Sequence, residues 1–297
     1  MSICAVVITY HPAEQIIGNI LALLDQADEI VIVDNGSGSS IQELLGRLEQ
    51  HSNVSVIYKP ENIGIAAALN IGVKHAKKLG YEWVITFDQD SKVTPNMIST
   101  MLRGYEAYPE KEKVASLSPR QQDQASGRVT SNNILSPNTE ISAYLQLLVV
   151  ITSGNMVKLN VFDIVGYFNE ALFIDHVDTE FCLRCATYGY KILEIQDAIL
   201  EHSLGTPTQH SFLWTAPVTS NHSVLRRYYN ARNGVYIYKK FVFSQPAWVF
   251  NHAYIYLKAI IVLMLFEDRR KKKLLAICRG VVHGLLGRLG KADNLFD

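Results

Sequence analysis

Glycine-rich phosphate-binding motifs are missing from this chain of 297 residues. The first expected strand ends in Thr9-Tyr10-His11-Pro12, where a dinucleotide-binding fold carries G-x-G-x-x-G, and no P-loop sequence occurs. The chain therefore lacks the two common glycine-rich loops whose backbone N–H groups bind the phosphates of a nucleotide. A phosphate-bearing ligand would need another anchor, and acidic residues further along the chain are suited to provide it.

An excess of charge of either sign is also absent, since 28 Lys and Arg residues balance 28 Asp and Glu residues. Without a net basic field, we expect no nucleic acid partner. The hydrophobic share of 48% allows a sizeable core and excludes a disordered chain. The length fits one large α/β domain with an extension, or two small domains.

Cysteines are few, and their spacing shows no disulfide framework. Cys182 and Cys185 form a C-x-x-C pair within a helical pattern, but no second pair completes a zinc site. We therefore expect them to be reduced core thiols. The N-terminus carries neither the charged region nor the cleavage site of a signal peptide, so the expected compartment is cytosolic.

Apolar strand patterns alternate with helical patterns in the first third of the chain. This alternation predicts an α/β fold with a parallel sheet and right-handed crossovers. The expected strands are Cys4–Tyr10, Glu29–Val33, Val54–Tyr58 and Trp83–Phe87, and the expected helices are Glu14–Leu24, Ile41–Leu48 and Ile65–Leu79. Further along we expect a helix over Pro95–Tyr108 and strands over Val114–Ser118, Tyr144–Thr152 and Lys191–Ile195, with a polar surface loop over Gln121–Thr139.

Polar side chains follow each of the first four strands. Right-handed crossovers bring these strand ends to one edge of the sheet, where open α/β folds bind ligands. Asp34 is placed to accept a hydrogen bond from a base or ribose. An equally good interpretation is that Asp34 only stabilises the turn after the strand. The strand-end residues are Thr9, Asp34, Asn62 with Gly64, and the pair Asp88 and Asp90.

Two carboxylates close the fourth strand in the sequence Asp88-Gln89-Asp90. Their burial would cost free energy unless a cation meets them. Mg²⁺ or Mn²⁺ on a phosphate-bearing ligand is the economical candidate, because these ions prefer oxygen ligands. The alternative is a helix cap beside a solvated turn.

Four stretches together resemble the family-2 inverting glycosyltransferases of the GT-A fold, and most of all the bacterial rhamnosyltransferases that build O-antigen and other surface polysaccharides. The stretches are Thr9-Tyr10, Val33-Asp34-Asn35, Glu61–Asn70 and Phe87-Asp88-Gln89-Asp90-Ser91. The resemblance implies a mostly parallel, twisted sheet flanked by helices, with a C-terminal helical extension. It also implies a metal held by Asp88 and Asp90, and donor-binding roles for Thr9, Tyr10, Asp34, Asn62, Gly64 and Asp88.

The same resemblance implies a general base in the acidic stretch before Cys182. Inverting transfer needs one carboxylate to deprotonate the acceptor hydroxyl. Alignment of the family motif on Cys182 and Arg184 places that base at Asp178, with Glu180 on the second acidic position. Val177 stands where the family often has Glu, and Asp175 is the alternative base. Any of these acids could instead simply favour the first turn of a helix.

Two residues further along complete the expected site. His202 lies in a His-x-x-Gly that resembles the family's third metal or pyrophosphate ligand, whereas a lone histidine is usually structural. Arg232, within Tyr228-Tyr229-Asn230-Ala231-Arg232-Asn233, matches a family motif and suits a pyrophosphate. The alternative is a solvated basic face.

The segment Phe241–Phe266 is apolar and aromatic but is interrupted by Lys258. Because a bilayer span needs about 20 apolar residues, we expect no transmembrane helix. The basic run Arg269–Lys273 follows, which suits a helix lying on an anionic inner-membrane surface. A helix pair packed on the catalytic domain or in a homo-oligomer is the alternative. The expected division is a catalytic domain over residues 1–220 and a helical region over residues 221–297.

The resemblance implies transfer of L-rhamnose from dTDP-β-L-rhamnose to a lipid-linked saccharide, with Mg²⁺ or Mn²⁺, at the cytoplasmic face of the inner membrane. Other donors of the same class are UDP-galactofuranose, UDP-GlcNAc and UDP-glucose. A non-catalytic sugar-nucleotide binder is the alternative from another class.

Overall fold

A computed structural model of the chain describes residues 1–292, apart from residues 125, 131–142, 203–207 and 210–217. The chain forms two compact units. Unit 1 comprises residues 1–170 and 177–203, and unit 2 comprises residues 171–176 and 204–297. Each unit is described separately below.

The first part of unit 1 is the expected alternation of parallel strands and helices. Strands β1, β2, β3 and β4 pair in parallel in the order β3-β2-β1-β4. These strands are almost wholly apolar, as buried parallel strands are. The elements are β1 (Ile3–Thr9), α1 (Gln15–Leu21), β2 (Glu29–Asp34), α2 (Ser39–Gly46), β3 (Val54–Tyr58), α3 (Ile65–Lys78) and β4 (Trp83–Asp88).

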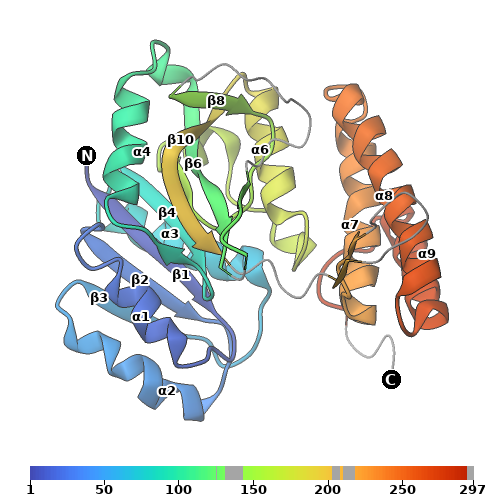
Figure 1. Cartoon of the computed structure of the whole chain (residues 1–297), viewed down its shortest axis with the longest axis horizontal. Helices are drawn as coiled ribbons and strands as arrows, with labels where there is room; N and C mark the ends of the chain where they lie inside the picture. The colour runs from blue at the N-terminus through green and yellow to red at the C-terminus, as the bar shows by residue number, and fades with distance from the viewer. Residues whose placement is uncertain (125, 131–142, 203–207, 210–217, 293–297) are drawn as a thin grey trace. The chain divides into compact units, whose positions relative to one another are not determined.

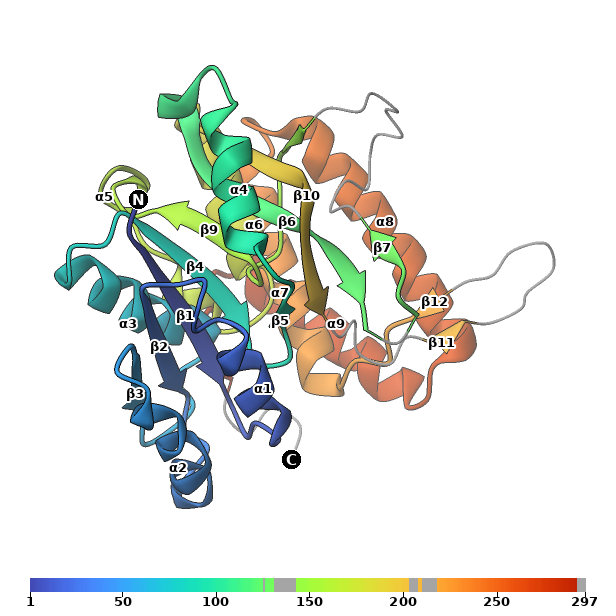
Figure 2. The same cartoon turned by 60° about the vertical axis from the view of Figure 1, so that its left-hand side comes forward.

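The second part of unit 1 extends the sheet beyond β4 to give the order β3-β2-β1-β4-β9-β6-β10-β5, which Figure 2 shows. Strand β9 is antiparallel to both β4 and β6, and β10 is parallel to β6. The sheet is therefore mixed, and the α/β class is confirmed. The elements are β5 (Lys92–Val93), α4 (Met97–Glu106), β6 (Val114–Asp123), β7 (Val129–Thr130), β8 (Tyr144–Leu147), β9 (Asn155–Lys158), α5 (Val161–Val165), α6 (Val177–Thr187) and β10 (Lys191–His202).

Three expected strands and one expected loop differ in the structure. The expected strand over Tyr144–Thr152 is limited to β8, and the short strand β9 follows it after a turn at Gly154, whose φ is +80°. Strands β6 and β10 run five or more residues beyond their expected ends, because they pair with each other as far as His202. The expected loop over Gln121–Thr139 therefore contains the end of β6 and strand β7, and its later part lies outside the described residues.

Helices cover both faces of the sheet. Helices α1, α2 and α4 pack on one face through a core that includes Ile16, Leu45 and Met101. On the other face, a Cβ atom at Gly72 of α3 would lie 2.2 Å from Val6 of β1, so only glycine allows this close approach. Cys182 of α6 is buried against β10, and burial raises its pKa well above the usual thiol range. Cys182 and Cys185 are both buried free thiols, as predicted.

Unit 2 is built on three helices, α7 (Val224–Phe241), α8 (Pro246–Phe266) and α9 (Arg270–Leu285), with a small ribbon of β11 (Thr208–Gln209) and β12 (Val218–Thr219). Figure 1 shows the three helices packed beside one another. Helix α9 lies close to α7, and glycines at the contact make this possible. A Cβ atom at Gly280 would lie 2.5 Å from the carbonyl oxygen of Tyr228, and one at Gly284 would lie 2.5 Å from that of Arg232.

A buried ion cluster joins the three helices. Glu267, at the end of α8, accepts hydrogen bonds from Arg227 of α7 and from Lys273 of α9. All three side chains are at most 8% exposed. Each buried charge in the cluster therefore has an opposite charge beside it, and the pairing fixes where α8 ends relative to α7 and α9.

Helix α8 is unbroken over 21 residues and is apolar enough in length and composition to cross a membrane. Its most apolar 18-residue window has a mean hydropathy of 1.7, and only 11% of that window is buried. Length and composition alone therefore do not exclude a span, since His252 and Lys258 interrupt the apolar pattern but not the helix, and the absence of a transmembrane helix stays a prediction.

Candidate functional site

The carboxyl ends of β1 and β2 are joined through two side chains that the sequence singled out. Thr9 lies opposite Asp34 in the parallel register, and the Thr9 hydroxyl donates to Asp34 Oδ1 over 3.0 Å. Asp34 is 2% exposed and also accepts from the backbone N–H and hydroxyl of Ser37. This network holds the turn after β2 in one conformation and fixes the direction of the Asp34 carboxylate.

The turns after β2 and β3 are joined by amide side chains. Asn35 donates to Asn62 Oδ1 at 3.3 Å, and its own oxygen accepts from the backbone N–H of Ile63 at 3.0 Å. Asn62 Oδ1 also accepts from the N–H of Gly64, whose φ is +88°. Asn62 and Gly64 therefore shape the turn that leads into α3, at the same sheet edge as Asp34.

Asn35, Gly36 and Ser37 were not among the expected site residues. A Cβ atom at Gly36 would lie 2.4 Å from the backbone carbon of Glu61, so the two turns touch at this point. The signal that could have found them is the polar, glycine-containing sequence Asp34-Asn35-Gly36-Ser37 directly after a strand.

Asp88, Asp90 and His202 form a cluster at the ends of β4 and β10. One potential ligand atom from each residue lies within 4.8 Å of the other two. His202 Nδ1 lies 3.5 Å from Asp90 Oδ1, and the Ser91 hydroxyl lies 2.9 Å from the same nitrogen. Two carboxylates and an imidazole are a donor set that fits Mn²⁺ or Mg²⁺. The three predicted metal ligands are thus brought together by the fold.

Two serines brace this cluster. Ser91 is hydrogen-bonded to Ser153 as well as to His202, and the Ser153 hydroxyl accepts from the backbone N–H of Asp88 at 3.3 Å. Ser91 is 4% exposed and Ser153 is fully buried. The two hydroxyls therefore hold the Asp88 backbone and the His202 ring in position. No sequence pattern selected Ser153, which lies in the turn before β9.

Gln89 connects the Asp88-Gln89-Asp90 turn to β1 and α1. Its side chain accepts from the backbone N–H of Tyr10 at 2.8 Å, and its carbonyl accepts from the Asn19 side chain at 2.9 Å. The Tyr10 side chain is 46% exposed, so its ring is accessible to a ligand.

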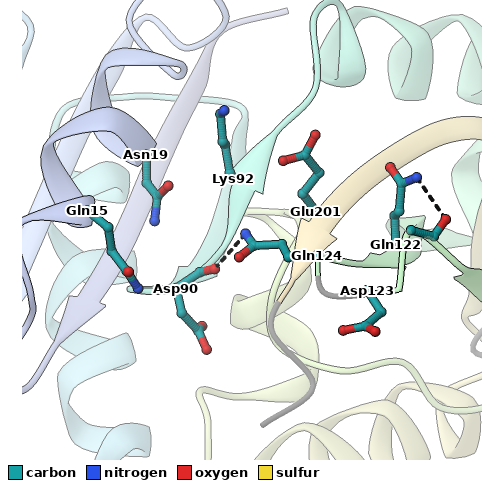
Figure 3. A pocket seen from close by; sticks show the side chains of 9 residues that line it. Gln15, Asn19, Asp90, Lys92, Gln122, Asp123, Gln124 and Glu201 are labelled. Atoms are coloured by element: carbon teal, nitrogen blue, oxygen red, sulfur yellow. Dashed lines mark hydrogen bonds between the residues drawn. The ribbon is translucent and has the colours of Figure 1, made fainter.

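A polar cavity of about 410 Å³ lies beside Asp90. Figure 3 shows side chains from α1, β5, β6 and β10 around it, and Gln124 donates to the backbone carbonyl of Asp90. Hydroxyl-rich ligands suit such amide and carboxylate linings. The cavity is lined by Gln15, Asn19, Asp90, Lys92, Gln122, Asp123, Gln124, Gly127 and Glu201.

The predicted base, Asp178, lies in the first turn of α6 and is partly exposed. Its Oδ1 atom accepts from the backbone N–H and the hydroxyl of Thr179. Glu180 is fully buried and is paired with Arg184, which also donates to the carbonyls of Val165 and Tyr167. Glu180 therefore anchors the segment before α6, whereas Asp178 is accessible to a ligand.

Asp175 and Arg232 belong to unit 2. Residues 171–176, here called the strap, contain three residues at positive φ, namely Phe173, Asp175 and His176. Asp175 Oδ1 accepts from Arg226 at 3.1 Å, while Oδ2 is buried without a hydrogen-bond partner among the described residues. Burial raises the pKa of Asp175, and the charges of Arg226 and Arg227 oppose that rise.

Arg232 is 1% exposed and donates to the carbonyls of Gly290 and Leu172. Its neighbour Asn233 is fully buried, and its amide donates to the strap carbonyls of Leu172, Ile174 and Asp175 at 2.8 to 3.0 Å. Arg232 thus holds backbone within unit 2, and the proposed contact with a donor pyrophosphate stays a prediction.

Comparison with known proteins adds to this geometry. The model described as glycosyl transferase family 2 matches residues 4–163. The dTDP-rhamnosyl transferase RfbF of Shigella flexneri is 33% identical in an alignment of 251 residues that covers 80% of this chain and 80% of that one. A poly-β-1,6-N-acetyl-D-glucosamine synthase of Staphylococcus aureus is 30% identical over 96 residues, 32% of this chain and 23% of that one.

Solved structures show the same fold at low identity. The mannosyltransferase PcManGT from Pyrobaculum calidifontis, in complex with GDP-Man and Mn²⁺, aligns with a TM-score of 0.57 and 16% identity over 96% of this chain and 87% of that one. GalNAc-T7, with UDP, GalNAc and Mn²⁺, aligns with a TM-score of 0.58 and 14% identity over 68% of this chain and 44% of that one. Both support the assignment of the fold, a mixed sheet flanked by helices of the GT-A type.

Proposed function

Because this chain belongs to glycosyltransferase family 2, we propose that it is a metal-dependent inverting rhamnosyltransferase. Its donor would be dTDP-β-L-rhamnose and its acceptor a lipid-linked saccharide of a surface polysaccharide. The observation that carries the proposal is the Asp88, Asp90 and His202 cluster, which the fold assembles at the sheet edge from two strands far apart in the sequence. The 33% identity with the Shigella enzyme over 80% of both chains supports the choice of sugar.

Different residues at the strand ends are suited to bind different parts of the donor. The turns that contain Asp34 and Asn62 lie beside each other and suit the nucleoside, since both present fixed polar atoms at the edge of the sheet. Asp88, Asp90 and His202 would hold Mg²⁺ or Mn²⁺, which when bound neutralises the negative charge of the diphosphate. Ser91 and Ser153 keep two of these three groups in position.

Asp178 takes the proton of the acceptor hydroxyl. As that O–H bond breaks, the acceptor oxygen forms a bond to C1 of rhamnose, and the bond from C1 to the diphosphate oxygen breaks. The electron pair of that bond leaves with dTDP, so charge and atoms balance, and attack opposite the leaving group converts a β-linked donor into an α-linked product. A positioned general base contributes about 10²- to 10⁴-fold to such a step.

A donor panel tests this function. The purified chain is incubated with Mn²⁺, a membrane extract that supplies lipid-linked acceptors, and one of four donors: dTDP-L-rhamnose, UDP-GlcNAc, UDP-galactofuranose or UDP-glucose. We expect acceptor-dependent release of dTDP from the rhamnose donor at a rate at least tenfold above the others, and loss of this release with EDTA. Faster turnover with a UDP-sugar would overturn the donor assignment but leave the transferase activity in place.

Two comparisons favour a second donor, UDP-GlcNAc. One relative is a poly-β-1,6-N-acetyl-D-glucosamine synthase of S. aureus, and the solved S. aureus TarS complex with UDP-GlcNAc has a TM-score of 0.54. The match with the synthase covers only 32% of the present chain, however, which is why the rhamnose donor is preferred. No turnover with any donor of the panel would favour a sugar-nucleotide binder without catalytic activity.

A further inference from the structure

One side of α8 presents a row of large apolar side chains to solvent. The spacing of four or three residues keeps them on one face of the helix. Single exposed apolar residues are common, but a continuous row over about four turns of helix marks an interaction surface. The row, here called the apolar stripe, consists of Phe250 (68% exposed), Tyr254 (57%), Leu257 (61%), Ile261 (60%) and Leu265 (52%).

Cations gather at the end of the same helix. Arg269, Arg270, Lys271 and Lys272 are exposed and follow α8 directly, with Asp268 the one exposed acid beside them. Lys273 is different, because it is buried and paired with Glu267. From Pro246 to Leu285, the acids are only Glu267 and Asp268, whereas the cations are Lys258, Arg269, Arg270, Lys271, Lys272, Lys273 and Arg279.

We propose that α8 lies in the plane of a membrane surface rich in anionic phospholipids. The apolar stripe enters the boundary between headgroups and acyl chains, and Arg269–Lys272 contact the anionic headgroups. An apolar face next to exposed cations has the charge and polarity that such a surface complements.

Two observations disfavour a helix that crosses the bilayer instead. Lys258 is exposed near the middle of α8, so a span would place its ammonium group near the bilayer centre, where charges are costly. In addition, Leu263 of α8 packs with Ala231 of α7 and Ile277 of α9, two helices that are much more polar. A span would break this packing or draw charged helices into the hydrocarbon, whereas a helix lying in the plane keeps it.

A second copy of the chain fits the apolar stripe less well than a membrane surface does. Lys258 lies among the stripe residues, with its amine 4.3 Å from the ring of Tyr254. A face-to-face contact between two α8 helices would bury two lysines, and the sequence of α8 contains no carboxylate to pair with them. At a membrane the lysine amine can extend to the headgroups while its methylenes stay on the apolar side.

The experiment measures binding of the full chain to vesicles of phosphatidylcholine alone and of phosphatidylcholine with about 30% phosphatidylglycerol, by co-sedimentation. We expect binding to the anionic vesicles only, and a loss of binding in 0.5 M NaCl because salt screens exposed charges. A variant without the four exposed cations should bind the anionic vesicles at least about tenfold more weakly than the wild type. Its substitutions are Arg269→Gln, Arg270→Gln, Lys271→Gln and Lys272→Gln. Its control neutralises four exposed cations of unit 1, Arg47, Lys74, Lys78 and Arg103, and should bind like the wild type.

A second variant tests the stripe itself. Serine replaces three stripe residues in this variant, which carries Phe250→Ser, Leu257→Ser and Ile261→Ser, and it should lose vesicle binding. The control removes three exposed apolar side chains from unit 1, through Leu79→Ser, Ile164→Ser and Tyr188→Ser, and should bind vesicles like the wild type. Circular dichroism and hydrolysis of the sugar nucleotide in solution check that each variant is folded. Equal binding to both vesicle types, no binding at all, or resistance to carbonate extraction would overturn the proposal. A dimer in solution that the serine variant dissociates would overturn it in favour of a second copy.

Discussion

The Nδ1 atom of His202 lies 3.5 Å from Oδ1 of Asp90, although one residue ends β10 and the other follows β4. A neutral imidazole and a carboxylate at this separation can both coordinate one ion. Their proximity depends on β10 extending to His202 along β6, which the sequence did not predict.

The first prediction follows from this relationship. Asp90→Ala and His202→Ala should each weaken Mn²⁺-dependent binding of the donor by more than about 100-fold, because each removes a proposed ligand of the ion. Ser91→Ala should weaken it by about tenfold, since it removes only a group that orients His202. Calorimetric titration of dTDP with and without Mn²⁺ measures both effects.

Asp123→Asn is the matched control for this series, because Asp123 lines the same cavity but lies outside the cluster of three. Its affinity should stay within about threefold of the wild type. Titrations of Asp90→Ala that match the wild type with Mn²⁺ present would show that the cluster holds no ion.

The second prediction separates the two candidate bases. Asp178→Asn should lower the transfer rate by about 10²- to 10⁴-fold while donor affinity is kept, because the amide cannot accept the acceptor proton. Asp175→Asn should retain most of the rate, since Asp175 is buried beside Arg226 in unit 2. Rates of dTDP release at saturating donor, together with donor affinity by titration, distinguish the two. The opposite ranking of the variants would assign the base to Asp175.

The third prediction compares two glycines of the same turn. Gly36 and Gly38 have φ values of +88° and +87°, so alanine is strained at both positions, at a cost of about 1–3 kcal/mol in the free energy of unfolding. Only at Gly36 would the new Cβ also meet the backbone of Glu61 and Asn62, whereas no described atom lies within 4 Å at Gly38.

Gly36→Ala should therefore displace the turn of Asn62 and weaken dTDP binding by at least about tenfold, while Gly38→Ala should lower stability but leave the affinity nearly unchanged. Thermal unfolding and calorimetry on the two variants provide the comparison. Equal affinities would mean that the contact between the two turns does not shape the nucleotide site.

The fourth prediction concerns the buried ion cluster of unit 2. Burial alone would raise the pKa of Glu267, but the hydrogen bond from Lys273 and the charges of Arg227 and Lys273 outweigh it, so the pKa lies below its ordinary value of 4.5. A carboxyl with a lowered pKa stabilises the fold above pH 4.5, and this contribution is lost as the pH falls through the lowered value.

Glu267→Gln should lower the free energy of unfolding at pH 7 by about 3–5 kcal/mol, because it leaves two buried cations without their partner. The deficit relative to the wild type should shrink as the pH falls below 4.5. Urea unfolding of both proteins at pH 7 and at pH 3.5 measures this. Glu43→Gln, whose side chain is 85% exposed beside Arg47, is the control and should cost under about 1 kcal/mol.

The sequence predicted the first half of the sheet well, and for a physical reason. Strands β1, β2 and β4 are almost wholly buried, so their sequences are apolar runs that end in polar turns, whereas β3 lies at the edge of the sheet and is half-buried. Asp34, Asn62 and Asp88 could be assigned to one sheet edge because the crossovers are right-handed. Strand β9 escaped prediction, since its four residues are too few for a periodic pattern and its pairing with β4 and β6 is not local.

Arg232 shows why burial cannot be predicted from a short motif. The sequence suggested a cation facing a ligand, yet its guanidinium is held by the carbonyls of Leu172 and Gly290, which lie 60 and 58 residues away along the chain. Ser153 was missed for the same reason, because its partners Asp88 and Ser91 precede it by more than sixty residues. Contacts of this range depend on the tertiary fold rather than on local pattern.

The strap limits where this chain can be cut and joined to part of another protein. Residues 171–176 belong to unit 2, although the chain on both sides of them belongs to unit 1, and Asn233 donates to three of their carbonyls. A chain cut after residue 203 would leave those carbonyls without their donor, directly before the helix that carries Asp178. The two parts of this chain on either side of residue 203 are therefore not independent, and a hybrid made from it should keep both its strap and its helix α7.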